Sequence, residues 1–242
     1  MKRFLILSAL GLFLVNILAV PSSAQTADEV IKKMIDAQGG KKVYEGIKDI
    51  TIIGTVELVQ QGVDGSITLY KKEPDKRRQD FEVMGMNLVE AYDGKVGWWT
   101  NQQTMEIEEM PEDRFIRSKR NSMPVVAPLF PDKYGLSHTL KGKETIEGNE
   151  YFVVIRKFPD DFEVSIYIDA KTYLPYKSIS QIEAQGMEIE VEQYTSDYKE
   201  VEGLMVAFST SQYLNGQEQM IMTVSEVKIN TGLEDSLFVM EK

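Results

Sequence analysis

The chain has 242 residues, of which 43% are hydrophobic and 27% are charged, as is typical of a globular protein. Acidic residues outnumber basic ones by 38 to 27, and the formal net charge of -11 argues against non-specific binding to nucleic acid or to an anionic membrane. The sequence has no cysteine and one histidine, His138, which excludes disulfides and cysteine nucleophiles and leaves little basis for a histidine metal site.

The first 24 residues have the pattern of a secretory signal peptide. A basic start is followed by an apolar run over residues 4–20, and Ser22 and Ala24 are the small residues that signal peptidase requires. The alternative is an uncleaved membrane anchor, but a helix of this length spans only about 25 Å, less than the ~30 Å hydrocarbon core. We expect residues 1–24 to be removed and residues 25–242 to be soluble outside the cytoplasm.

A helix is predicted directly after this segment. Thr26 and Glu29 have the spacing of a capping box, and the apolar residues of 30–35 recur at helical spacing. Gly39 and Gly40 are expected to end the helix.

From residue 48 onwards, apolar and polar residues alternate as in half-buried strands. Strands are predicted at 48–58, 66–72, 77–84, 87–92, 96–101, 104–109, 150–157, 163–169, 176–184, 187–194, 204–213 and 219–230. The connections are too short for parallel crossovers, so the sheet should be antiparallel. No linker or repeat divides the chain, and about a dozen strands in one domain, residues 25–242, predict a single, strongly curved sheet.

Residues 111–130 interrupt this alternation. Pro111 and the acidic residues after it predict a short helix at 112–119, and Pro124 and Pro128 exclude a regular strand beyond it. The apolar residues of this segment fit two interpretations equally well. They could form a mobile flap over the concave side of a sheet, or a loop that fills an ordinary core.

Catalytic motifs are absent from the sequence: it contains no G-x-S-x-G, no phosphate-binding glycine loop and no H-E-x-x-H. Ser137 and His138 are adjacent, and neighbours on a strand point to opposite faces, so they cannot share a proton. Glu188, Glu190 and Glu192 could resemble the paired carboxylates of a glycosidase, but alternating exposed glutamates on a half-buried strand are the simpler interpretation. We therefore expect no enzyme activity, no metal and no cofactor.

Three arginines at helical spacing, Arg114, Arg117 and Arg120, form a positive patch on this acidic protein. A solvated helix face explains them, and so does docking to an acidic partner. We retain them as candidate docking residues.

Several short segments recur in a characteristic order and spacing. They are Gly39-Gly40 before the first strand, 73–77 (EPDKR), 91–98 (AYDGKVGW), 168–175 (IDAKTYLP), 196–204 (SDYKEVEGL) and the ending 233–238 (LEDSLF). Together they resemble the LolA-like outer-membrane lipoprotein-sorting proteins, over nearly all of the mature chain. The resemblance implies a mainly β (α+β) fold, in which one curved antiparallel sheet forms an open half-barrel covered by an N-terminal helix and a mid-chain helical lid.

The resemblance also implies a function. It implies a monomeric periplasmic carrier that holds the acyl chains of a lipoprotein or another lipid between an inner-membrane donor complex and an outer-membrane acceptor, with no nucleic acid involved. Such carriers place an arginine before the proline of the segment at 73–77, where it helps to hold the lid, and this chain has Glu73 there. A lipid-sensing regulatory module of the same fold is the alternative, and a hydrolase is a distant third.

The cavity implied by the resemblance should be lined by apolar side chains of the first strands, the short helix and the lid. These are Ile50, Ile52, Val56, Leu58, Leu69, Phe81, Val83, Trp98, Phe115, Val125, Val126, Leu129 and Phe130.

Overall fold

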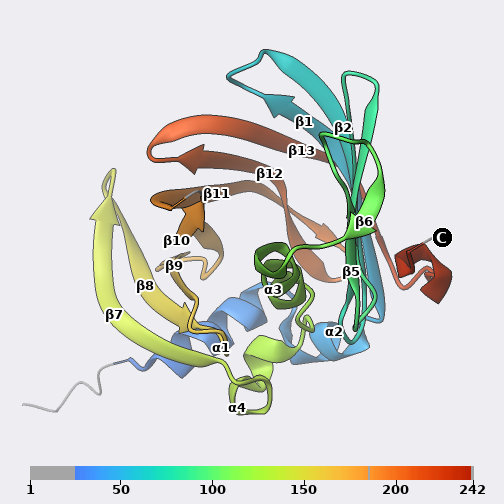
Figure 1. The fold of residues 1–242 in the computed structure, drawn as a ribbon. Helices are drawn as coiled ribbons and strands as arrows, with labels where there is room; N and C mark the ends of the chain where they lie inside the picture. Colours follow the sequence, from blue (N-terminus) through green and yellow to red (C-terminus); the bar gives the residue numbers. More distant parts are fainter. Residues whose placement is uncertain (1–24, 185, 241–242) are drawn as a thin grey trace, which may run out of the picture.

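One antiparallel sheet organises the chain. A computed structural model describes residues 25–184 and 186–240, and the expected signal peptide, residues 1–24, lies outside the described residues. The sheet has 13 strands and curves around the helices (Figure 1). The expected single curved sheet is therefore confirmed.

The strands are β1 (Asp49–Leu58), β2 (Val63–Lys72), β3 (Lys76–Val83), β4 (Met86–Tyr92), β5 (Gly97–Thr100), β6 (Ile107–Glu109), β7 (Ser137–Ile146), β8 (Asn149–Lys157), β9 (Glu163–Asp169), β10 (Pro175–Ala184), β11 (Met187–Val201), β12 (Leu204–Leu214) and β13 (Gln217–Ile229). The helices are α1 (Ala27–Ala37), α2 (Gly40–Gly46), α3 (Glu112–Asn121) and α4 (Pro131–Tyr134), with 3-10 turns η1 (Ala127–Leu129) and η2 (Asp235–Phe238).

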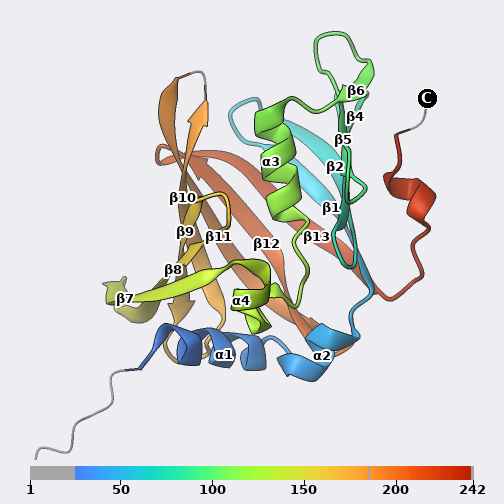
Figure 2. The same ribbon diagram turned by 60° about the horizontal axis from the view of Figure 1, so that its bottom comes forward.

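The strand order determines where the irregular segment runs. Across the sheet the order is β6-β5-β4-β3-β2-β1-β13-β12-β11-β10-β9-β8-β7. β6 and β7 follow one another in the chain but form opposite edges, so the sheet is an open half-barrel. The connection between them carries α3, η1 and α4, and it has to cross the open side. Figure 2 shows α3 standing on the concave side of the sheet.

Every strand that the alternation predicts is present, with small shifts at most ends, although β11 continues to Val201, well beyond the predicted end at residue 194. β6 is shorter than predicted, and β7 is an additional strand that the alternation does not predict. Most side chains of β7 are exposed or half-buried. It is an edge strand, so it lacks the continuous apolar stripe by which central strands are recognised.

Helix α1 begins with the predicted capping box. The Glu29 backbone N–H donates to Thr26 Oγ1 at 3.2 Å, and the Thr26 N–H donates to Glu29 Oε2 at 3.0 Å. The helix ends at Ala37, just before the two glycines. Gly39 has a φ of 119°, and a Cβ there would lie 2.2 Å from the carbonyl oxygen of Gly203 between β11 and β12. Glycine is therefore needed where the helices contact this end of the sheet.

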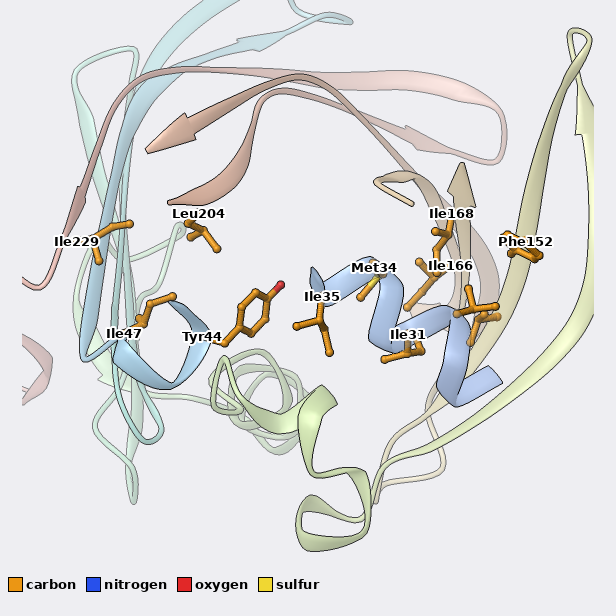
Figure 3. Close-up of a cluster of buried hydrophobic side chains, with 12 residues drawn as sticks. Ile31, Met34, Ile35, Tyr44, Ile47, Phe152, Ile166, Ile168, Leu204 and Ile229 are labelled. Carbon is orange, nitrogen blue, oxygen red and sulfur yellow. The ribbon is translucent and has the colours of Figure 1, made fainter. Parts of the chain in front are cut away.

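The main core lies between α1, α2 and the concave face of the sheet (Figure 3). Its labelled members are Ile31, Met34, Ile35, Tyr44, Ile47, Phe152, Ile166, Ile168, Leu204 and Ile229. The strand residues among them belong to β8, β9, β12 and β13, and Ile50 of β1 packs against the same core, so the two helices cover one end of the half-barrel. The opposite end is not covered by these helices (Figures 1 and 2).

Candidate functional site

The strand register identifies the side chains of the concave face. Ile52 pairs with Leu69 on β2 and with Val227 on β13, and directly paired residues share a face. Val227 packs against the core beneath the helices, so this face is the concave one. By the same register the concave face also carries the predicted residues Ile50, Val56, Leu58, Phe81 and Val83.

Much of this apolar surface is only half-covered. Val56 and Val83 are buried, whereas Ile52, Leu58, Leu69 and Phe81 are half-buried. Apolar side chains that remain partly accessible on a concave surface can contact a ligand without any rearrangement of the strands.

Helix α3 packs on the concave face of β4 and β5. The rings of Phe115 and Tyr92 meet edge to face with centroids 5.7 Å apart. Tyr92 pairs with Gly97, where a Cβ would lie 2.7 Å from the Met110 sulfur and 3.3 Å from the Phe115 ring. The missing side chain at Gly97 thus lets the helix approach the sheet closely. The expected mid-chain helical lid is confirmed in α3.

A cavity of about 630 Å³ lies beside α3. Its lining is mainly apolar and comes from the turn before β3, from β4, from α3 and the residues after it, from α4 and from the β8–β9 turn. The lining residues are Pro74, Asp75, Tyr92, Phe115, Ile116, Lys119, Arg120, Ser122, Met123, Pro124, Tyr134, Pro159 and Asp160. Its volume is within the range of roughly 300–1,000 Å³ typical of small-molecule sites.

Arg120 links α3 to the far edge of the sheet. Its Nη1 donates to Asp160 Oδ2 at 2.7 Å, and its guanidinium lies 3.5 Å from the ring centroid of Phe162. Asp160 and Phe162 lie in the connection between β8 and β9, close to one edge of the sheet, whereas α3 follows β6 at the opposite edge. This contact therefore bridges the open side of the half-barrel.

Arg114 fixes the other side of α3. Its guanidinium lies 3.9 Å from the ring centroid of Trp99, and its Nη1 is 3.4 Å from Glu90 Oε2. Glu90 also accepts from Arg77 at 3.2 Å. Two of the three candidate docking arginines, Arg114 and Arg120, are thus engaged within the molecule, whereas Arg117 forms no ion pair with the described residues.

Comparison with known proteins identifies the fold. No protein-family model and no curated protein matches the sequence. A solved structure of a LolA superfamily protein from Nitrosomonas europaea aligns with a TM-score of 0.60 at 13% identity, covering 90% of this chain and 99% of that chain. An outer membrane lipoprotein-sorting protein domain from Vibrio parahaemolyticus aligns at 0.58 and 14%, covering 88% and 95%. A DUF1329 family protein from Desulfovibrio piger aligns at 0.61 and 10%, covering 89% and 98%. The chain has a LolA-like fold.

Within this LolA-like fold, Glu73 contacts the residues that follow α3, which we name the lid segment (residues 122–130). The Val125 backbone N–H donates to Glu73 Oε1 at 2.9 Å. Two residues earlier, Lys71 Nζ donates to the carbonyl oxygens of Met123 and, at 3.4 Å, of Asn121. Lys71, on β2, and Glu73, just after β2, thus bind the backbone at the end of α3 and in the lid segment.

Burial raises the pKa of Glu73 above its ordinary value of 4.5, although the Val125 N–H and the Lys71 ammonium oppose the shift. Because the folded-state pKa is raised, the contribution of Glu73 to stability is full below pH 4.5 and is lost as the pH rises through the folded-state pKa. Glu73→Gln should therefore be more stable than the wild type at pH 7, with a flatter pH profile above pH 4.5, since glutamine still accepts from Val125.

The measurement is urea denaturation at a series of pH values between 4 and 8. Glu57→Gln is the matched control, because it makes the same substitution at a side chain that is exposed on β1. If Glu73→Gln keeps the wild-type pH profile, the titration of Glu73 does not bear on stability.

The lid segment divides between core and surface. Val125, Val126 and Leu129 pack against the main core, as expected for a core-filling loop. Phe130 is 36% exposed, and Lys41 Nζ lies 5.4 Å from its ring centroid. The structure therefore separates the two interpretations by position: α3 covers the concave face, and the apolar residues after it fill the core at its base.

Trp98 lies on the convex face, which corrects its expected place in the cavity. Its indole Nε1 donates to the Phe238 carbonyl at 2.8 Å, beneath the C-terminal segment. Trp99 occupies the concave face instead, because consecutive residues of a strand point to opposite sides. Alternation shows that the two rings must separate, but not which one faces the helices.

Sequence reasoning also missed much of the site: of the residues that line the cavity beside α3, it predicted only Phe115 as a cavity residue. The register places Met220 and Met222 of β13 beside Leu58 and Val56 on the concave face, and Tyr92 and Trp99 beneath α3. The methionines could have been found from their alternation in β13. The aromatic pair depends on where α3 packs, which the local sequence does not carry.

No helix among residues 25–184 and 186–240 is long and apolar enough to cross a membrane. Within the same ranges, no group of three or more metal-ligating side chains is positioned to hold an ion.

Proposed function

We propose that this protein is a periplasmic carrier that binds acyl chains of a lipoprotein or another lipid and moves them toward the outer membrane. The observation that carries the proposal is the mainly apolar cavity of about 630 Å³ beside a helix that crosses an open half-barrel. Each acyl methylene withdrawn from water contributes roughly 0.8 kcal/mol, so such a surface suits an acyl chain. The description of one fold neighbour as a lipoprotein-sorting domain supports this use.

The direct test is displacement of a fluorescent fatty acid from the mature protein, together with mass spectrometry of an organic extract of protein purified without detergent. Saturable binding and a co-purified lipid are expected. A flat titration with folded protein contradicts a carrier of acyl chains.

Arg120→Met tests the lid. The substitution removes the partly buried bond to Asp160, and a hydrogen bond between charged groups contributes about 1.5–3 kcal/mol. We expect the dissociation rate of bound fatty acid to rise about tenfold, as measured by stopped-flow displacement. Asp160→Asn should give a similar increase, and the double variant should add little, because both remove one contact.

Arg117→Met is the control for charge, since it removes an arginine from α3 without breaking a bond of the described structure. If Arg117→Met and Arg120→Met raise the dissociation rate equally, the effect comes from the charge of α3. If Arg120→Met does not raise the rate, the contact between Arg120 and Asp160 does not determine release.

We also propose that residues 25–242 act as one exported, monomeric unit. Fractionation of cells that express the full chain should recover a protein beginning at Gln25 in the periplasmic fraction, as shown by N-terminal sequencing. Full-length chain in the membrane pellet would indicate that residues 1–24 remain as an anchor.

A further inference from the structure

Arg156 is a cation on the concave side of β8 that the cavity described above does not include. It pairs with His138 of β7 and Val164 of β9. It follows Val154 by two residues, so it shares the face of Val154, which packs in the main core with α1.

The guanidinium of Arg156 has unused hydrogen-bonding capacity. Its Nε donates to His138 Nε2 at 3.0 Å. Its Nη2 is shielded from solvent and has no hydrogen-bond partner among the described residues. None of the described carboxylates forms an ion pair with it. A shielded cation without a counter-ion destabilises a fold, and such a group in a native structure calls for an explanation.

His138 and Tyr44 do not supply a negative charge, and Asp28, which acts on the pKa of His138, forms no ion pair with Arg156 in the described structure. Burial, with a smaller contribution from Arg156, lowers the pKa of His138 to about 4, so the imidazole is neutral at pH 7. Burial raises the pKa of Tyr44 to about 12, and its neutral hydroxyl donates to Gln38 Oε1 at 2.9 Å. Figure 3 shows the Tyr44 hydroxyl directed into the space between the helices and the sheet. No described side chain that contacts Arg156 thus supplies its counter-ion.

We propose that Arg156 binds the anionic end, a carboxylate or a phosphate, of an acyl-chain ligand whose apolar body lies against the concave face. The planar fork of a guanidinium matches the paired oxygens of either group. Leu140 and Val164, on the strands next to β8, are partly buried apolar residues that pack against the main core. Because these neighbours of Arg156 are apolar, the site suits an anionic group attached to an apolar chain better than it suits a free anion. This inference rests on the proposed function, and it specifies the polar end of the cargo.

The test is calorimetric titration of the mature protein with dodecanoate, dodecyl phosphate and dodecanol, which share one chain length. At least one anion should bind at least tenfold more tightly than dodecanol, a difference of about 1.4 kcal/mol. Which anion binds more tightly distinguishes a fatty acid from a phospholipid-like source. In Arg156→Met, the affinity for that anion should fall to the affinity for dodecanol, and dodecanol binding should be unchanged. Arg117→Met, which removes the same charge elsewhere, should keep the preference.

The outcomes separate this site from the proposed function. Saturable binding of all three ligands with equal affinity overturns the assignment of Arg156 but leaves an acyl-chain carrier. No binding of any ligand overturns both. A preference for anions that survives Arg156→Met also overturns the assignment. Arg156→Lys is the alternative if Arg156→Met does not fold, because it keeps the charge but removes the planar guanidinium. It should reduce the preference for the anion over dodecanol at least threefold. An unchanged preference contradicts the site.

Discussion

Phe115→Asp is expected to weaken acyl-chain binding at least 100-fold while the sheet stays folded. Phe115 lines the cavity and holds α3 against Tyr92. An ionised carboxylate in this apolar contact loses its hydration, so α3 should leave the sheet before the charge is buried. A new pair with Lys119, four residues on, returns only about 0.2–0.5 kcal/mol. A 100-fold loss of affinity is about 2.7 kcal/mol, which the detached helix readily accounts for.

The readouts are fluorescent fatty-acid titration for affinity and far-ultraviolet circular dichroism for the sheet. Met105→Asp is the matched control, because it also replaces an apolar side chain by an acid but lies in the exposed loop between β5 and β6. Its affinity should be that of the wild type. If Phe115→Asp binds fatty acid normally, the cavity beside α3 is not where the acyl chain lies.

The sequence predicts most of the strands because their signal is local. A central strand such as β1 contacts apolar groups on one face and solvent or polar groups on the other, so Ile50, Ile52 and Val56 recur at every second position. β7 lacks this stripe because it lies at an edge. The pairing of β1 with β13, which joins the two halves of the sheet, connects residues far apart in the chain and leaves no local pattern.

The site was less predictable than the strands, for the same reason. Helical spacing places Arg114 and Arg120 on one helix, but their partners Trp99 and Phe162 lie near opposite edges of the sheet. The lid segment crosses the open side of the sheet because it is part of the connection between β6 and β7, which form the two opposite edges. Glu73 shows the limit of the resemblance: an acid at the arginine position still holds the lid segment, because its partner is a backbone N–H.

The convex face behind the site has its own covering. The segment around η2 lies against β2, β3 and β5 there: Asp235 pairs with Lys72 and Lys76, and Arg78 Nη1 donates to the Leu237 carbonyl at 2.9 Å. Phe238 is fully buried (0% exposed) although its 3-10 turn is only four residues long. So short a turn has little stability of its own, and the buried ring is the main apolar contact that holds it.

Phe238→Ala is therefore expected to lower the free energy of unfolding by about 3–5 kcal/mol, because it removes a buried ring and leaves a cavity against the sheet. Urea denaturation measures the change. Val239→Ala, at a side chain that is 48% exposed, should change stability by about 0.5 kcal/mol or less. Because Phe238 and Trp98 lie on the convex side, fatty-acid affinity of the folded Phe238→Ala protein should be unaltered. This is the opposite of the result expected for Phe115→Asp. A loss of affinity without a loss of stability in Phe238→Ala would mean that the convex covering, and not α3 alone, shapes the concave site.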